Sequence, residues 1–133
     1  MPQMPGTFRP KHMPSRQEQR REHDQRRGSA RERGYTTAWD KAARGFKRSH
    51  PLCLGCHAVG RVKPTEVVDH VVPHRGDNAL FWDRTNWQAS CHWHHDAVKQ
   101  RLELLFDQGK LKQSDLRLDS DAAMKLTLDL DPR

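Results

Sequence analysis

The chain has 133 residues, is 34% hydrophobic and 31% charged, and carries a formal net charge of +7. This length allows one small domain, and so polar a domain has an apolar core that is only marginally stable without a staple such as a metal. The sequence has no apolar run near the roughly 20 residues of a membrane span and no recognisable signal peptide. We therefore expect a cytoplasmic protein with reduced cysteines and no membrane partner.

The positive charge is concentrated in the first third of the chain. Residues 1–50 hold 13 Lys and Arg residues against 5 Asp and Glu residues, whereas residues 51–106 hold 6 of each. Residues 1–33 offer almost no apolar face to bury, so we expect a basic, largely disordered arm, with at most a transient helix over residues 16–33. Such an arm indicates a polyanionic partner, most simply nucleic acid, although a solvated tail would have the same composition.

The first packed helix is predicted over residues 36–48, where Thr36 or Thr37 supplies the cap and Pro51 stops the chain from continuing as a helix. Its apolar residues follow helical spacing: Trp39, Ala42, Ala43 and Phe46. A tight turn is expected next, at Cys53-Leu-Gly-Cys56, where Gly55 would relieve backbone strain.

Two short strands are predicted in the middle of the chain, which gives a small α+β fold. The mostly β-branched residues 67–72 predict the first strand, and residues 87–90 predict the second. Residues 74–85 between them predict a loop with a short apolar anchor. The anchor consists of Leu80, Phe81 and Trp82.

A second helix is predicted over residues 92–106, with Gly109 as its stop signal. The tail over residues 107–133 is of uncertain order. Three of its leucines alternate with other residues, which indicates an edge strand or no ordered structure. These leucines are Leu126, Leu128 and Leu130.

Two pairs of metal-binding residue types flank the predicted strands. Cys53 and Cys56 form a C-x2-C pair, and Cys91 and His94 form a C-x2-H pair. Four sulfur and nitrogen donors at these spacings favour a closed, tetrahedral structural zinc site. Two other interpretations exist. The cysteines would also fit as small buried hydrophobic residues, and Cys53 to His57 match the C-x-x-C-H pattern of c-type haem attachment, which leaves Cys91 and His94 unexplained.

Four further residues suggest phosphodiester chemistry: Asp69, His70, Asn86 and His95. Hydrolysis of a phosphodiester needs an activated water and stabilisation of charge on the phosphate. A neutral histidine is a suitable base, and a carboxylate with an imidazole can hold a divalent ion without filling its coordination sphere. Because neighbours on a strand point to opposite faces, Asp69 and His70 would bracket one phosphate, with His95 completing the metal site.

These motifs, in this order, resemble the HNH endonucleases, and in particular the small HNH proteins of phages and prophages. The resemblance covers residues 34–105 and includes the RGYTTAW lead-in, the PLCLGC turn, the DHVVPHRGD stretch and the final histidine-rich helix. Relatives often carry a second C-x2-C pair where this chain has Cys91 and His94, and histidine is an equally good zinc ligand. The resemblance implies a ββα-metal (His-Me finger) fold over residues 34–106.

The resemblance also implies an activity: metal-dependent cleavage of double-stranded DNA, by nicking or by cutting both strands. His70 corresponds to the general base, Asp69 and His95 to the ligands of a catalytic Mg²⁺, Mn²⁺ or other divalent ion, and Asn86 to the residue that pins the loop between the strands. His74 and Arg75 lie just past the first strand, where the position fits a contact with the DNA phosphates and fits ordinary loop surface equally well. Phage relatives further suggest a partnership with the terminase subunits that package DNA.

Two alternative functions compete with this prediction. A non-catalytic zinc-finger module that binds nucleic acid would explain the zinc pairs and the basic arm, but gives Asp69, His70 and His95 no role. A structural adaptor bound to a larger nuclease would need a degenerate site, and the set of Asp, His, Asn and His is intact. Metal-dependent nicking of a plasmid distinguishes an enzyme from either alternative.

Overall fold

The structure, a computed structural model, describes residues 15–27 and 34–133 and divides into two compact units, Met1–Arg33 and Gly34–Arg133. In the first unit, α1 (Arg16–Arg27) begins at a reciprocal cap, in which the amide of Glu18 donates to Oγ of Ser15 and the Glu18 carboxylate accepts from the Ser15 amide. This part of the basic arm is therefore helical. The expectations for residues 1–14 and 28–33 lie outside the described residues.

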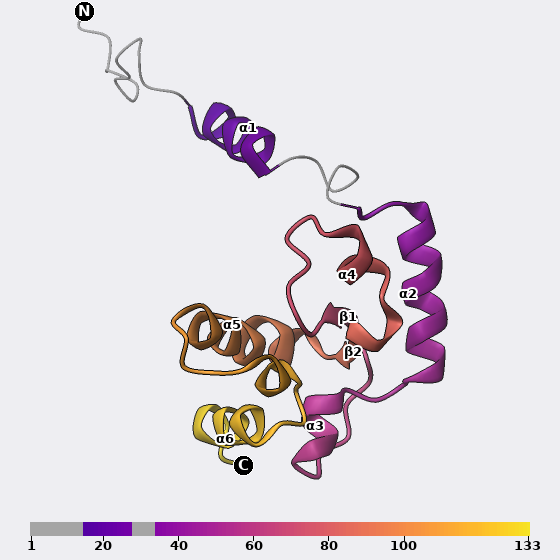
Figure 1. Cartoon of the computed structure of the whole chain (residues 1–133), viewed down its shortest axis with the longest axis vertical. Coiled ribbons are helices and arrows are strands. Elements are labelled where there is room, and N and C mark those ends of the chain that lie inside the picture. Colours follow the sequence, from indigo (N-terminus) through magenta and orange to yellow (C-terminus); the bar gives the residue numbers. More distant parts are fainter. Residues whose placement is uncertain (1–14, 28–33) are drawn as a thin grey trace, which may run out of the picture. The chain divides into compact units, whose positions relative to one another are not determined.

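The second unit is a small α+β structure with a two-stranded sheet, as the sequence predicts (Figure 1). Short helices, 3-10 turns and one π-helical turn surround the sheet. In chain order the elements are α2 (Thr37–Ser49), α3 (Leu54–Ala58), β1 (Val67–His70), α4 (Asn78–Trp82), η1 (Arg84–Asn86), β2 (Trp87–Ser90), η2 (His94–Lys99), α5 (Gln100–Asp107), η3 (Gln113–Leu116) and α6 (Asp121–Leu130). No helix in the described parts of the chain is long and apolar enough to cross a membrane.

The predicted helix over residues 36–48 is confirmed as α2, and its cap is Thr36, whose hydroxyl accepts a hydrogen bond from the Trp39 amide at 3.4 Å. The strand predicted over residues 67–72 ends earlier, at His70. It ends there because Val71 and Asn86, the next pair in register, form only one of the two ladder bonds: the Val71 amide donates to the Asn86 oxygen, but the Asn86 amide donates to the backbone oxygen of Asp83.

The two strands are antiparallel, with Asp69 opposite Gln88 and His70 opposite Trp87. Alternation along the strands separates two apolar clusters, one on each face of the sheet. The cluster against α2 contains Trp39, Phe46, Val68, Phe81, Trp87 and Ala89. The cluster beneath the last helices contains Val71, Val98, Leu102, Leu116, Leu118 and Ala123.

The loop predicted over residues 74–85 contains two short helical turns, α4 and η1. Asp77 caps α4 by accepting from the amides of Ala79 and Leu80, and Asp83 caps η1 by accepting from the amide of Thr85. The helix predicted over residues 92–106 begins with the π-helical turn η2 and continues as α5, which ends before Gly109. This glycine has a φ of +74°, a backbone conformation that terminates helices readily.

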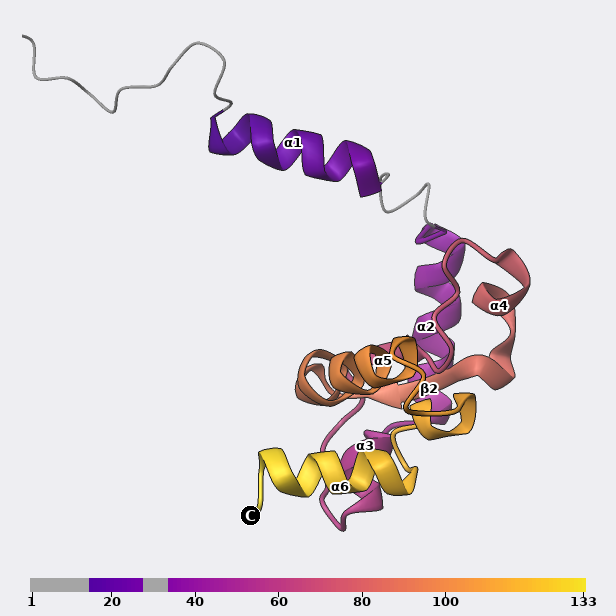
Figure 2. The same cartoon turned by 60° about the vertical axis from the view of Figure 1, so that its left-hand side comes forward.

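The prediction of an edge strand or of no ordered structure in the tail is wrong, because residues 121–130 form the helix α6. The hydroxyl of Ser120 caps it by accepting from the amide of Ala123, and Ala123 and Thr127 lie fully buried one turn apart. In both views α6 lies beside α3 and below α5 (Figures 1 and 2). The tail is thus a packed part of the second unit and contributes to its core.

Candidate functional site

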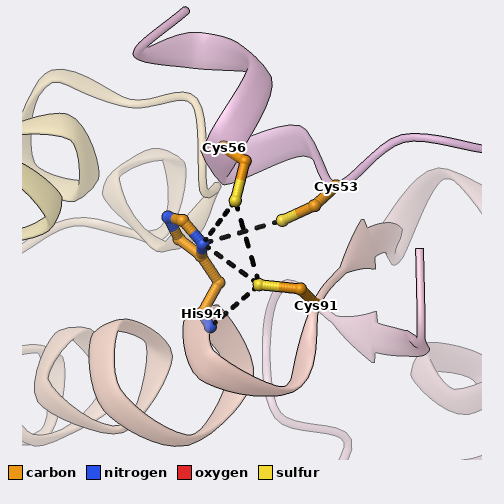
Figure 3. A group of neighbouring side chains, drawn as sticks. All are labelled: Cys53, Cys56, Cys91 and His94. Atoms are coloured by element: carbon orange, nitrogen blue, oxygen red, sulfur yellow. Dashed lines mark hydrogen bonds between the residues drawn. The ribbon is translucent and has the colours of Figure 1, made fainter. Parts of the chain in front are cut away.

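Three cysteines and one histidine meet at the junction of α3, β2 and η2 (Figure 3). Cys53 precedes α3, Cys56 lies within it, Cys91 follows β2 and His94 begins η2. The Nδ1 atom of His94 lies 3.7 Å, 3.4 Å and 3.5 Å from the sulfur atoms of Cys53, Cys56 and Cys91, and the sulfurs of Cys56 and Cys91 lie 3.9 Å apart. All four residues are buried.

These distances fit a tetrahedral metal centre. Metal–sulfur bonds of about 2.3 Å and metal–nitrogen bonds of about 2.0–2.1 Å place two sulfurs about 3.8 Å apart and a sulfur and a nitrogen about 3.6 Å apart. The four donor atoms all lie within 4.8 Å of one another. The buried Cys3His cluster can therefore hold a metal such as zinc, and the four residues that the two sequence pairs predict are the ones that meet.

The thiols perturb one another's acidity. Burial and the two neighbouring sulfurs raise the pKa of Cys56 to about 12. Burial also raises the pKa of Cys53, but the neighbouring His94 side chain and hydrogen bonds from the backbone at Cys56 and Cys91 outweigh this effect and bring its pKa down to about 6. Three thiolates this close repel one another strongly, and a dication is the kind of group that allows all three to ionise together.

His94 is held in the tautomer that a metal ligand needs. Its Nε2 atom lies 3.1 Å from Oγ1 of Thr127, and the Thr127 hydroxyl donates its own proton to the backbone oxygen of Ala123. Oγ1 can therefore only accept from the imidazole, which places the proton on Nε2 and leaves the Nδ1 lone pair facing the thiols. Gly55 packs against this ring, since a Cβ at position 55 would lie 2.2 Å from Cδ2 of His94. Close approach, rather than backbone strain, explains this glycine.

The neighbouring histidines lie outside the cluster. His92 is exposed, and its amide donates to the carboxylate of Glu66 at 3.1 Å. His57 is exposed on α3. Both thiols of the C-x-x-C pair point inward toward Cys91 and His94, so the structure accounts for the pair that the haem interpretation leaves unexplained (Figure 3).

A second group of polar side chains lies on the sheet face next to η2. Oδ1 of Asp69 lies 3.8 Å from Nε2 of His95, and Nδ1 of His95 lies 2.9 Å from a carboxylate oxygen of Asp96. The other oxygen of Asp69, Oδ2, accepts from the Gln88 amide at 2.8 Å and faces the Lys99 ammonium at 3.1 Å. One carboxylate oxygen and one imidazole nitrogen thus face each other, while their remaining polar atoms are occupied.

Lys99 is a site residue that the sequence reasoning missed. It is 1% exposed, and its ammonium also donates to the backbone oxygen of His70 at 2.8 Å. A lone lysine in a helix is normally solvated, so composition gives no reason to bury it. Its spacing offers a hint, because it follows His95 by four residues and therefore lies on nearly the same side of a helix.

His70 points to the opposite face of the sheet. Its ring stacks on Trp39 with centroids 5.1 Å apart, lies 4.9 Å from the ring of His74, and is 7% exposed. Burial lowers the pKa of His70 below its ordinary value of 6.5, although a hydrogen bond to the backbone oxygen of Phe81 partly offsets the shift. The imidazole is therefore held in its neutral form near pH 7.

The side chain of Asn86 forms hydrogen bonds to two backbone segments of the loop between the strands. Its side-chain oxygen accepts from the Val72 amide at 2.9 Å, and its side-chain nitrogen donates to the backbone oxygens of Val72 at 2.9 Å and Leu80 at 3.3 Å. The amide is 7% exposed and its polar atoms are engaged with backbone. The bond to Leu80 fixes the segment before Phe81, whose backbone oxygen contacts the His70 ring.

His74 and Arg75 lie in the loop between β1 and α4. Nε2 of His74 is 3.3 Å from the hydroxyl of Tyr35. Arg75 is exposed, has the unusual backbone φ of +48°, and forms an ion pair with Asp107 at the end of α5. This pair joins the loop to α5, the helix that also carries Glu103.

Comparison with known proteins adds no assignment to this geometry. A scan against family models, a search of curated proteins and a search of solved structures each returned no match.

Proposed function

We propose that the protein is a metal-dependent endonuclease of the HNH type that hydrolyses phosphodiester bonds in double-stranded DNA. The observation that carries this proposal is the pairing of Asp69 Oδ1 with His95 Nε2 at 3.8 Å. The residue next to Asp69 in β1 is His70, whose pKa is lowered by burial. In this proposal β1, β2 and η2 with α5 are the ββα-metal motif. Zinc in the Cys3His cluster is its structural staple.

The donor set of the pair suits a divalent ion. With metal–ligand bonds of about 2.1 Å, two donors on one ion lie between about 3.0 Å and 4.2 Å apart, and the observed 3.8 Å falls in this range. The contact between Asp96 and His95 is of the kind that orients metal-binding imidazoles. When bound, Mg²⁺, Mn²⁺ or another divalent ion would supply charge stabilisation for the phosphate and the leaving oxygen.

The hydrogen bond of His70 identifies its basic atom. Nε2 lies 3.0 Å from the backbone oxygen of Phe81, and a carbonyl oxygen only accepts, so Nε2 carries the proton. Nδ1 of the neutral ring is then the atom that takes a proton from the attacking water. Asn86 and Trp39 hold this ring in place, the first through the loop and the second by stacking.

Contacts to DNA would come from His74, from Arg75 and from the arginines at the start of α1. His74 lies within 4.9 Å of the His70 ring, and Arg75 is exposed beside it, so both are suited to phosphate oxygens near the base. The exposed arginines at the start of α1 extend the positive charge into the arm. A link to phage terminase subunits is supported by the resemblance of the motifs alone.

The competing proposal, a non-catalytic zinc module, accounts for the Cys3His cluster but gives no reason for Asp69 to face His95. Incubating supercoiled plasmid with the zinc-loaded protein distinguishes the two. We expect Mg²⁺- or Mn²⁺-dependent nicking that stops on chelation of the added ion, and His70→Ala should slow it by about 10²- to 10⁴-fold. His92→Ala is the matched control, since His92 is exposed and outside both sites. Intact plasmid with every divalent ion would favour the binding module.

A further inference from the structure

The buried ammonium of Lys99 lies against the proposed metal-binding carboxylate. Its Nζ atom is 3.1 Å from Oδ2 of Asp69 and 2.8 Å from the backbone oxygen of His70, and the side chain is 2% exposed. Glu103, one helical turn further on, lies 3.8 Å from the same ammonium. A buried cation therefore sits where a divalent cation is also expected to bind.

This placement has two consequences for an incoming ion. Lys99 and Gln88 occupy Oδ2 of Asp69, so Oδ1 and the His95 imidazole are the donors left to it. Mg²⁺ and Mn²⁺ take about six ligands, most of which must then come from water or substrate. In addition, Lys99 already compensates the charge of Asp69, and like charges a few ångströms apart in a buried site repel strongly.

We propose that Lys99 is a counter-charge that keeps the affinity of the Asp69–His95 pair for divalent cations low in the free protein, so that the ion is bound together with a DNA phosphate. The inference rests on the proposed function and deepens it. The phosphate supplies both the missing oxygen ligands and the missing negative charge. By linkage, the ion and the DNA then strengthen each other's binding by the same factor.

A purely structural role for Lys99 predicts the opposite sign. If the ammonium only held Asp69 and the end of β1 in place, its removal would loosen the pair and weaken cation binding. If it is a counter-charge, its removal leaves the negative charge of Asp69 uncompensated, and cation binding tightens. Glu103→Gln provides the matched test, because it removes a negative charge beside the same ammonium and should weaken cation binding.

The experiment measures Mn²⁺ binding by electron paramagnetic resonance to the full, zinc-loaded chain in a His70→Ala background, in which DNA cleavage is strongly slowed. Without DNA, we expect Lys99→Met to bind Mn²⁺ on the order of tenfold more tightly than the background protein, and Glu103→Gln to bind it less tightly. Adding a short duplex should tighten Mn²⁺ binding to the background protein by a similar factor, and by less in Lys99→Met. Asp69→Asn shows which signal belongs to this site.

Unchanged or weaker Mn²⁺ binding in zinc-loaded Lys99→Met would overturn the inference. If Lys99→Met does not fold, the other arms decide: Mn²⁺ affinity that neither the duplex nor Glu103→Gln alters overturns it as well. Failure of the proposed function looks different. In that case plasmid stays intact with the unmodified protein and Mn²⁺, and Asp69→Asn leaves Mn²⁺ binding unchanged.

Discussion

The hydroxyl of Thr127 in α6 lies 3.1 Å from Nε2 of His94, on the far side of the imidazole ring from the three thiols. Thr127 is fully buried, and α6 begins 27 positions after His94 in the sequence, at Asp121. A helix from the last part of the chain therefore supplies the hydrogen bond that orients the only histidine of the cluster. The Cys3His cluster and the packing of α6 are coupled through this contact.

We predict that Thr127→Val, which keeps the shape of the side chain and removes the hydroxyl, weakens zinc binding by about 10- to 100-fold. The Nε2 proton of His94 would lose its acceptor, and the ring its preferred tautomer. Thr127→Ser keeps the oxygen and should stay close to the unmodified protein. Competition with a chelator measures the affinity. Equal affinities for Thr127→Val and Thr127→Ser would exclude this coupling.

Gly55→Ala should lose zinc and lower the melting temperature. The added methyl would lie 2.2 Å from Cδ2 and 2.5 Å from Nε2 of the His94 ring, so the imidazole or α3 must move. Gly45→Ala is the control, since a Cβ there meets nothing within 4 Å in the middle of α2, and should stabilise the protein by up to about 1 kcal/mol. Zinc content and thermal unfolding of both variants check the prediction. Full zinc content in Gly55→Ala would show that the ring has room.

The pH dependence of nicking should reflect the lowered pKa of His70. The neutral ring is the active base, so the rate should fall as pH falls through the folded-state pKa. Because burial moves that pKa below 6.5, we expect little loss between about pH 7.5 and 6.5. The electrostatic effect of the neighbouring His74 also lowers the His70 pKa, so His74→Gln should move the acid limb to higher pH. An acid limb already at or above 6.5 in the unmodified protein contradicts this prediction.

The ion pair between Arg75 and Asp107 should compete with DNA for the guanidinium. Asp107→Asn frees Arg75 and should tighten binding to duplex DNA at low salt, whereas Arg75→Ala should weaken it. Asp119→Asn is a matched control, because Asp119 pairs with Arg117 at a similar exposure elsewhere on the surface. A salt titration of binding by fluorescence anisotropy measures the effects. If Asp119→Asn tightens binding as much as Asp107→Asn, net charge alone is responsible.

Local patterns in the sequence predict α2, β2 and the four members of the Cys3His cluster. Each of these depends on residues close together in the sequence: the apolar stripe of α2, the short segment from Trp87 to Ser90, and the two x2 gaps. The C-x2-H pair also selects His94 over its neighbours. This selection succeeds because two residues are the gap that lets a chain return to one ion.

The residues that the sequence reasoning missed depend on contacts between distant segments. Lys99 is buried because Asp69, 30 positions earlier, faces it, and no local pattern contains that pairing. In α6, the alternating leucines mimic a strand, while Ala123 and Thr127 pack at helical spacing. The Ser120 cap before Asp121 was the signal that would have identified this helix.

The central claim is that the start of η2 contributes one histidine to each of two metal sites, the Cys3His cluster and the Asp69–His95 pair, and that only the Asp69–His95 pair takes part in cutting DNA. His94 and His95 are adjacent, yet His94 faces the thiols and His95 faces Asp69. The most direct test is the plasmid-nicking rate of His95→Ala, measured on protein that retains one zinc per chain and unfolds at the temperature of the unmodified protein. We predict that metal-dependent nicking is lost while zinc and fold remain. Nicking at the full rate by this folded, zinc-loaded variant would contradict the claim.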